Sequence, residues 1–137
     1  MKYAVTILDL IPCGCDEEGE VIAELENGLI VNFYYQGSDV QAIRKFQIGK
    51  TIEIDLIGQL CSAKATKSDI TTFNFPKNSS YFQAEGKLLR TRLIDDEEYF
   101  ILKSNLILDF QIEFGELSLP NGSNIYVSGE LWANDWW

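Results

Sequence analysis

Within short segments of this chain, apolar residues recur at every second position, and turn-forming residues separate the segments. Within residues 51–61, for example, Ile52, Ile54 and Leu56 alternate with acidic residues. An extended strand points successive side chains to opposite faces, so this period of two indicates strands with one buried face. The sequence therefore predicts an all-β protein, either one small Greek-key barrel or two similar β lobes.

Gly, Pro, Asn and acidic residues mark the turns between the predicted strands. Asn27-Gly28 is the clearest hairpin signal, because both residues tolerate the positive φ of a tight turn. The predicted strands cover residues 3–11, 20–25, 29–35, 51–61, 82–94, 98–103, 106–114 and 125–132, with a further short strand inside 70–75.

One short helix is predicted near residues 38–46. Ser38 is a suitable N-cap, and Gln41 follows three residues later, as a capping box requires. A helix of about two turns would then place three apolar side chains on its inner side. The residues predicted to face the core are Val40, Ile43 and Phe46.

Acidic charge is distributed evenly over the two ends of the chain. The protein has 137 residues and a net charge of −10, with 21 acidic and 11 basic residues. Residues 1–60 and 81–137 each hold ten acidic and four basic residues, whereas 61–80 hold one and three. A phosphate backbone would be repelled by such a surface, and a basic protein would be attracted. The alternative is that the acidity serves only solubility.

The two acidic ends also resemble each other in sequence. Three pairs of segments match in the same order: 16–20 with 95–98, 29–33 with 106–110, and 54–60 with 125–131. This echo favours one compact unit over 1–137, built from repeat lobes 1–61 and 81–132 with a connector at 62–80. Chance similarity between alternating segments is the alternative explanation.

The first of these lobes resembles the OB fold, a five-stranded Greek-key barrel with a helix or loop between its third and fourth strands. The likeness rests on a three-strand meander, the helical turn, and the following pattern Gly49-x-x-Ile52-x-Ile54-x-Leu56-x-Gly58-x-Leu60. SH3-like and other small barrels share most of this order. Gly58 and Gly129 are expected where a strand bends or another backbone approaches closely.

Histidine and the common phosphate-binding motifs are missing from the sequence. The chain has no histidine, which excludes Ser-His-Asp and Cys-His catalysis and histidine metal sites. It also has no glycine-rich phosphate loop of the Walker or dinucleotide type. We therefore expect no enzyme, no catalytic residues and no cofactor.

Cys13, Cys15 and Cys61 are the only cysteines. An odd number of cysteines, together with an N-terminus that reads as a strand, favours reduced thiols in the cytoplasm. Three thiolates could contribute to a zinc site, but structural zinc takes four ligands with wider spacing, so no metal is expected. No apolar run approaches the length that spans a bilayer.

Two groups of residues are candidates for binding. The acidic turns occupy matching places before the second strand of each lobe, and the aromatic candidates are one outward-facing tyrosine and the C-terminal tryptophans. The candidate binding residues are Asp16, Glu17, Glu18, Glu20, Tyr34, Asp95, Asp96, Glu97, Glu98, Trp132, Trp136 and Trp137. For the tryptophans, docking on the protein's own fold is the alternative to docking on a partner.

These features favour an acidic, non-enzymatic protein-binding module with a basic protein partner. Its composition is similar to that of immunity proteins, which neutralise basic toxins. The alternative is an OB-type oligonucleotide-binding protein, which the fold resemblance favours and the charge opposes. The sequence does not indicate an oligomeric state.

Overall fold

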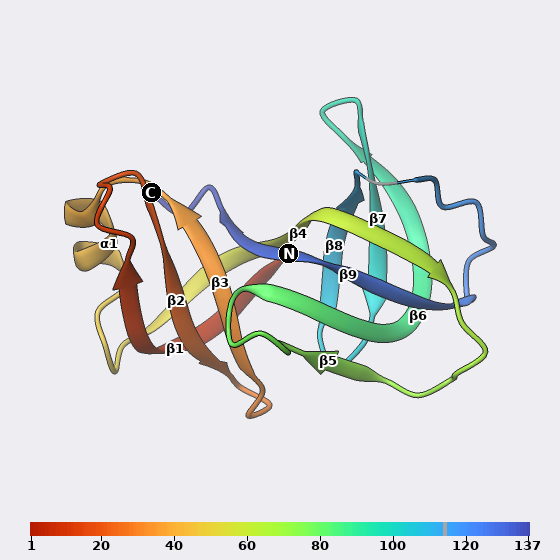
Figure 1. The fold of residues 1–137 in the computed structure, drawn as a ribbon, viewed down its shortest axis with the longest axis horizontal. Coiled ribbons are helices and arrows are strands. Elements are labelled where there is room, and N and C mark those ends of the chain that lie inside the picture. Colours follow the sequence, from red (N-terminus) through yellow and green to blue (C-terminus); the bar gives the residue numbers. More distant parts are fainter. Residues whose placement is uncertain (114) are drawn as a thin grey trace.

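The computed structural model describes residues 1–113 and 115–137, except for the side chain of Ile94. Over these residues the chain forms nine strands and one short helix, which confirms the predicted all-β class (Figure 1). The elements are β1 (Lys2–Pro12), β2 (Glu18–Leu25), β3 (Ile30–Gln36), α1 (Asp39–Lys45), β4 (Thr51–Ala65), β5 (Thr72–Asn74), β6 (Tyr81–Ile94), β7 (Glu97–Lys103), β8 (Ile107–Ile112) and β9 (Asn124–Asn134).

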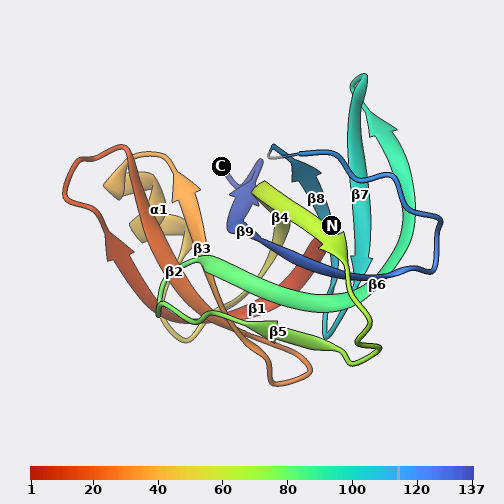
Figure 2. The ribbon, with the colours of Figure 1, turned by 45° about the vertical axis from the view of Figure 1, so that its right-hand side comes forward.

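The strands form one sheet that closes on itself twice. In the first ring the order is β1-β2-β3-β9-β4, and β4 pairs back with β1. In the second ring the order is β6-β7-β8-β4-β9, and β9 pairs back with β6. The rings lie side by side, with α1 at the outer end of the first (Figures 1 and 2). The fold is therefore small and β-barrel-like.

Strands β4 and β9 belong to both rings and run antiparallel across the middle of the molecule. The first part of β4 pairs with β1, and its later part pairs in parallel with β8. Likewise, the first part of β9 pairs with β6, and Trp132 near its end pairs in parallel with Tyr34 of β3. Each ring is thus completed by strands that it shares with the other.

Most predicted strand boundaries agree with the structure to within a few residues. The predicted strand 51–61 is longer, because β4 continues to Ala65, and the predicted connector therefore begins later than residue 62. Within that connector, the short predicted strand corresponds to β5. The strand predicted over 106–114 is β8, which ends at Ile112, and Phe114 lies outside the described residues.

The short helix begins as predicted, but its buried face is different. The side chain of Ser38 accepts a hydrogen bond from the backbone N–H of Gln41. The side chain of Gln41 accepts one from the backbone N–H of Ser38, which completes the capping box. Val40 and Ile43, predicted to be core residues, are each 58% exposed. Ala42 is buried instead, together with Phe46, whose ring packs against Phe33 and Tyr35. The prediction for Val40 and Ile43 is therefore wrong, because ring packing by Phe46 fixes the rotation of the helix.

Gly129 lies where β9 crosses β4, as the sequence predicts for a close backbone approach. A Cβ atom at this position would collide with the sulfur of Cys61 and lie 2.9 Å from the carbonyl oxygen of Gln59. The register of β4 against β9 shifts between Gln59 and Ser62, directly opposite this glycine. Only a residue without a side chain fits this crossing.

We expect Gly129→Ala to lower the free energy of unfolding by about 1–3 kcal/mol, as overpacking of a well-packed core does. Denaturant unfolding followed by circular dichroism measures this change. Gly28→Ser in the β2–β3 turn is the comparison variant. Gly28 has φ +87° and open space around its Cα, so this substitution introduces backbone strain without a steric clash. A Gly129→Ala protein as stable as the wild type would contradict the close approach.

Candidate interaction surface

The aromatic residues near the C-terminus follow β9 and have different environments. Trp136 is buried, with its ring 4.9 Å from that of Phe46 and 5.5 Å from that of Tyr35. Its indole N–H donates a hydrogen bond of 3.0 Å to the carbonyl oxygen of Gln36. Trp136 therefore docks on the fold and closes the end of the first ring beside α1.

Trp137 has the opposite environment and is 74% exposed. Its ring packs edge to face against that of Trp136, with 5.9 Å between the centroids. The buried ring of Trp136 therefore supports the exposed ring of Trp137. On one side it borders a cleft of about 660 Å³, which we call the α1 cleft. The α1 cleft is lined by Asp16, Glu17, Gln36, Gly37, Ser38, Gln41 and Trp137.

A second, more apolar hollow is lined by both Trp136 and Trp137. It has a volume of about 360 Å³ and includes Gln41, Arg44 and Lys45 of α1. Trp137 therefore lines both an acidic hollow and one bordered by basic side chains. Val40 and Ile43 on the same helix, and Ile48 just after it, are also exposed. This end of the molecule therefore presents apolar side chains to solvent.

The acidic wall of the α1 cleft is the turn between β1 and β2. Both carboxylates, those of Asp16 and Glu17, are exposed. The turn is fixed to the start of α1, because the backbone N–H of Asp39 donates to Asp16 Oδ1 at 2.8 Å and that of Gly37 donates to the Glu17 carbonyl oxygen at 2.8 Å. The structure thus brings Asp16 and Glu17 together with Trp137, although at least 120 positions of sequence separate them from it.

Cys13 and Cys15 in this turn form a disulfide, which corrects the expectation that all three thiols are reduced. The pairing is possible because Gly14 has φ +85° and reverses the chain between the two cysteines. Cys61 remains a free, buried thiol in β4. The three sulfurs therefore do not form a common ligand set.

Tyr34 and Trp132 form a second aromatic cluster, at the place where the two rings meet. Their ring centroids are 5.2 Å apart, and both side chains are half-buried. Glu20 stands opposite Tyr34 on β2, and Glu130 accepts the Trp132 indole N–H at 3.1 Å. Desolvation, followed by the charges of Glu20 and Glu130, raises the pKa of Tyr34. Ser80 of the second ring donates to the Glu20 carboxylate at 3.2 Å, so this face is partly covered.

The remaining acidic candidates lie on the second ring. Asp95, Asp96, Glu97 and Glu98 are exposed at the β6–β7 turn, which projects away from α1 in both views (Figures 1 and 2). Gln111 of β8 donates to the Glu97 carboxylate at 2.9 Å. Glu18 is exposed beside Cys15 and does not line the α1 cleft. The two acidic turns therefore belong to different surfaces.

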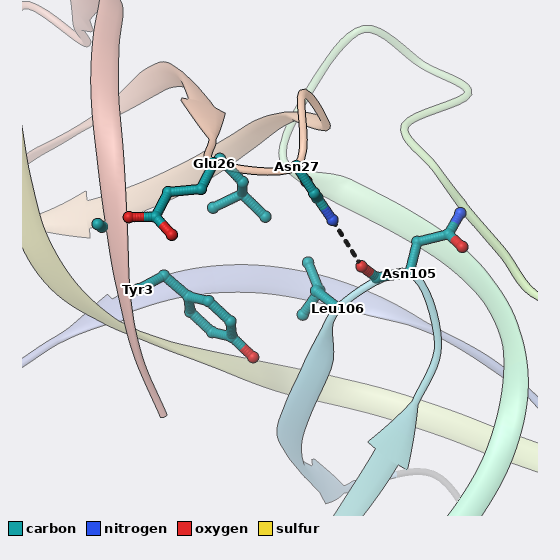
Figure 3. A pocket seen from close by; sticks show the side chains of 7 residues that line it. Tyr3, Glu26, Asn27, Asn105 and Leu106 are labelled. Carbon is teal, nitrogen blue, oxygen red and sulfur yellow. Dashed lines mark hydrogen bonds between the residues drawn. The ribbon is translucent and has the colours of Figure 1, made fainter.

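A small pocket of about 200 Å³ lies where the β2–β3 turn meets the β7–β8 turn. Figure 3 shows Asn27 pointing at Asn105 across it, and the Asn27 amide donates to the Asn105 carbonyl oxygen at 3.0 Å. The buried side chains of Leu25 and Leu106 form part of its wall. These contacts join the two rings, and we interpret the pocket as a gap in the contact between them.

Asp109 is a buried charge that the sequence pattern missed. Alternation places Leu108 and Phe110 inward and Asp109 outward, yet Asp109 is only 2% exposed. Its carboxylate accepts a hydrogen bond of 2.7 Å from Arg92 of β6 and one of 3.2 Å from the amino group of Met1. Desolvation, followed by the charges of Asp109 and Asp55, raises the pKa of Tyr3. Both ion pairs go to Asp109 Oδ2, whereas Asp109 Oδ1 is buried and has no hydrogen-bond partner among the described residues.

Cys61 provides a prediction about pH. Burial first, and the charge of Glu130 second, raise the pKa of its thiol to about 12. The folded state therefore holds this proton more tightly than the unfolded state does. The resulting stability is present below the unfolded pKa near 8.5 and is lost as the pH rises from there towards 12.

We expect the free energy of unfolding to fall over this alkaline range, and to fall less in Cys61→Ala, as measured by urea unfolding at several pH values. Equal pH dependence of the two proteins would contradict the assignment.

The chain matches no protein-family model and no curated protein. Among the described residues, no helix is both long and apolar enough to cross a membrane.

Proposed function

We propose that this protein is a non-enzymatic, acidic binding module that captures a basic partner protein through the surface around α1. The observation that carries the proposal is Trp137, which is 74% exposed and lines both the α1 cleft and the hollow beside Arg44 and Lys45. Neutralisation of a basic toxin, as by an immunity protein, is the most specific form of this function. The absence of histidine supports a non-enzymatic role.

Trp137 has the properties of an interface anchor. Tryptophan is enriched among the residues that contribute most to binding energy, because it buries a large area with few rotatable bonds. Trp136 is already fixed by its hydrogen bond to Gln36 and by its aromatic neighbours, so the chain that carries Trp137 is ordered before binding. Less conformational entropy is then lost when a partner covers Trp137.

The charge around this anchor favours a basic partner. The Asp39 N–H fixes the Asp16 carboxylate, and the Gly37 N–H holds the backbone of Glu17, so a Lys or Arg side chain entering the cleft would meet a fixed Asp16 carboxylate and the neighbouring carboxylate of Glu17. Complementary charge mainly increases the association rate and the specificity. The β6–β7 turn lies on the other ring, so we assign Asp95–Glu98 a steering role through the overall field and no direct contact at α1.

The strand order supports the resemblance to the OB fold. In the first ring, a meander of three strands is followed by α1, then by β4, and β9 closes the ring between β3 and β4. That is a five-stranded Greek-key arrangement with its helix after the third strand, as in OB folds. We propose that the first ring is OB-like, with β9 as its fifth strand.

The register supports internal duplication. Ala23 stands opposite Val31 in the first ring, and Leu102 stands opposite Leu108 in the second, so β3 and β8 match with the offset of 77 residues found in the sequence. For β4 and β9, pairing with β1 and β6 matches Thr51 with Asn124, an offset of 73. The offset of 71 from the sequence is two residues away, which preserves the inward and outward alternation. We propose that the rings arose by duplication followed by exchange of their last strands.

Oligonucleotide binding is the alternative that this fold brings with it. An outward aromatic on the third strand, Tyr34, is the feature that favours base stacking. Its neighbours are the carboxylates of Glu20 and Glu130, and Ser80 covers the same face from the second ring. Negative charge beside the aromatic would repel a phosphate backbone, so we favour protein binding.

The proposal is tested by capture from a lysate of the source cell with three forms of the protein as bait. Wild type and Leu93→Ala are expected to retain the same basic protein, and Trp137→Ala is expected to lose it. Leu93 is the matched control because it is an exposed apolar side chain, 72% exposed, on the second ring. Single-stranded homo-oligonucleotides are tested in parallel, and tight binding with a steep dependence on salt would favour the alternative function.

A prediction about rates follows for the second acidic turn. Replacing Asp95, Asp96, Glu97 and Glu98 with Asn or Gln is expected to slow association with the captured partner and to leave folding intact, because these side chains are exposed. The effect should shrink as salt shortens the screening length from about 10 Å at 0.1 M to about 3 Å at 1 M. Stopped-flow or biosensor association rates measure it. An unchanged association rate at low salt would remove this turn from the steering surface.

A further inference from the structure

The β1–β2 turn places two cysteines and a glutamate together at the surface. One ligand atom from each of Cys13, Cys15 and Glu18 lies within 4.8 Å of the other two. All three residues are exposed, so an ion in solution can reach them. The two cysteines form a disulfide in this structure. The chemistry of the turn therefore depends on whether that disulfide is oxidised or reduced.

Hydrogen bonds fix the shape of this turn without using the disulfide. The backbone N–H of Cys13 donates to the Glu18 carbonyl oxygen at 3.1 Å and closes the turn. The N–H of Cys15 lies 3.0 Å from Cys13 Sγ, which is the arrangement that stabilises a thiolate sulfur. Contacts of Asp16 and Glu17 to the start of α1 hold the tip of the turn. The ligand atoms should therefore remain close after reduction.

We propose that the reduced turn binds one Zn²⁺ ion through the thiolates of Cys13 and Cys15 and the carboxylate of Glu18, with water as the fourth ligand. Zn²⁺ takes sulfur ligands at about 2.3 Å and carboxylate oxygens at about 2.0–2.2 Å in a tetrahedron, so its ligand atoms lie about 3.3–3.8 Å apart. The observed cluster spans such a set once the sulfurs separate. Gly14, with φ +85° and open space around its Cα, lets the two cysteines move apart.

Charge also favours a cation at this position. The neighbouring Asp16 and Glu17 are exposed carboxylates, and the whole chain carries a net charge of −10. A divalent cation compensates the thiolates and the carboxylate together. Cys61 cannot join the site, because it is buried in β4 beneath Gly58 and Gly129.

The steps balance with a small-molecule dithiol as reductant. The dithiol transfers two electrons and two protons to the protein disulfide, becoming a disulfide itself and leaving two protein thiols. Zn²⁺ then replaces both thiol protons, which are released to solvent. An oxidant that re-forms the disulfide removes both sulfur ligands and releases the ion.

The experiment is a titration of the full chain with Zn²⁺ by calorimetry, after reduction with a dithiol and its anaerobic removal. We expect stoichiometric binding with proton release in the reduced protein and none in the oxidised protein. Titration with Co²⁺ provides a second readout, because thiolate ligands give a charge-transfer absorption in the near ultraviolet. Reduced Cys13→Ser/Cys15→Ser is expected to lose both signals.

Matched variants separate this site from the acidic surface around it. Glu18→Gln is expected to weaken Zn²⁺ binding by at least about tenfold, whereas Glu17→Gln, which removes only a neighbouring charge, should weaken it much less and Cys61→Ala should bind like the wild type. The proposal is overturned if the reduced wild type binds no Zn²⁺, or if binding survives Cys13→Ser/Cys15→Ser, which would reveal an ion held by the acidic turn only. This test is independent of the proposed capture of a partner, since it uses the protein alone.

Discussion

Replacing Phe33 or Phe110 with alanine is expected to lower the free energy of unfolding by about 3–5 kcal/mol at each site, the cost of removing a fully buried phenylalanine. Both side chains are 0% exposed. Phe33 packs against Phe46 in the first ring, with 5.9 Å between ring centroids, and Phe110 packs against Phe100 in the second, with 5.6 Å. Each variant leaves a cavity that a closed ring of strands cannot collapse to fill.

Chemical denaturation followed by circular dichroism and tryptophan fluorescence measures both effects. Because β4 and β9 belong to both rings, we expect each variant to unfold in a single transition that both probes report. Leu93→Ala, at an exposed position, should remain within about 0.5 kcal/mol of the wild type. Changes that small at both phenylalanines would contradict the assignment of the buried faces.

Trp137→Ala is expected to weaken binding of the captured partner by about 30-fold or more, which corresponds to the 2 kcal/mol that defines a hot-spot residue. The loss should lie mainly in faster dissociation, because truncating an apolar anchor removes contacts of the bound state. Asp16→Asn/Glu17→Gln should instead slow association, with an effect that salt suppresses. Biosensor kinetics separate the two rates.

Stability should not change with Trp137→Ala, since the side chain is 74% exposed and its neighbour Trp136 closes the ring. An unchanged melting temperature therefore accompanies the expected loss of affinity. If the dissociation rate equals that of the wild type and of Leu93→Ala, Trp137 is not the anchor. The apolar residues of α1 would then be the next positions to substitute.

Local patterns predicted the local structure well, for a clear physical reason. Alternation of apolar residues determines which strand face can be buried, and the alternating residues Val31 and Phe33 of β3 and Leu108 and Phe110 of β8 are all buried. The capping box between Ser38 and Gln41 is likewise a contact between residues close in sequence. Such features depend on neighbours three residues away or fewer.

Features that depend on distant contacts were not predictable in this way. No local signal indicates that β4 and β9 complete both rings, because their pairing joins residues about 70 positions apart. The pattern placed Val40, Ile43 and Phe46 on one helical face, but α1 ends at Lys45 and Phe46 is its C-cap. Phe46 is buried as predicted, against Tyr35 and Trp136, and the helix then buries Ala42 and exposes Val40 and Ile43.

The candidate site was predicted in its parts but not in its assembly. Asp16, Glu17 and Trp137 were all identified from the sequence, and only the folded chain brings them to one cleft. Trp136 was grouped with them, but its hydrogen bond to Gln36 places it inside the fold. The burial of Asp109 depends on Arg92 from another strand, which alternation within β8 does not indicate.

Hydrogen–deuterium exchange of the protein, free and bound to its captured partner, tests whether the partner docks around α1. We expect binding to protect the β1–β2 turn around residues 13–18, the segment 36–45 that includes α1, and the backbone at 136–137. We expect little change in the β6–β7 hairpin over residues 89–98. Protection confined to that hairpin, or to the covered face around Tyr34 and Trp132, with none at α1, would contradict the proposed surface.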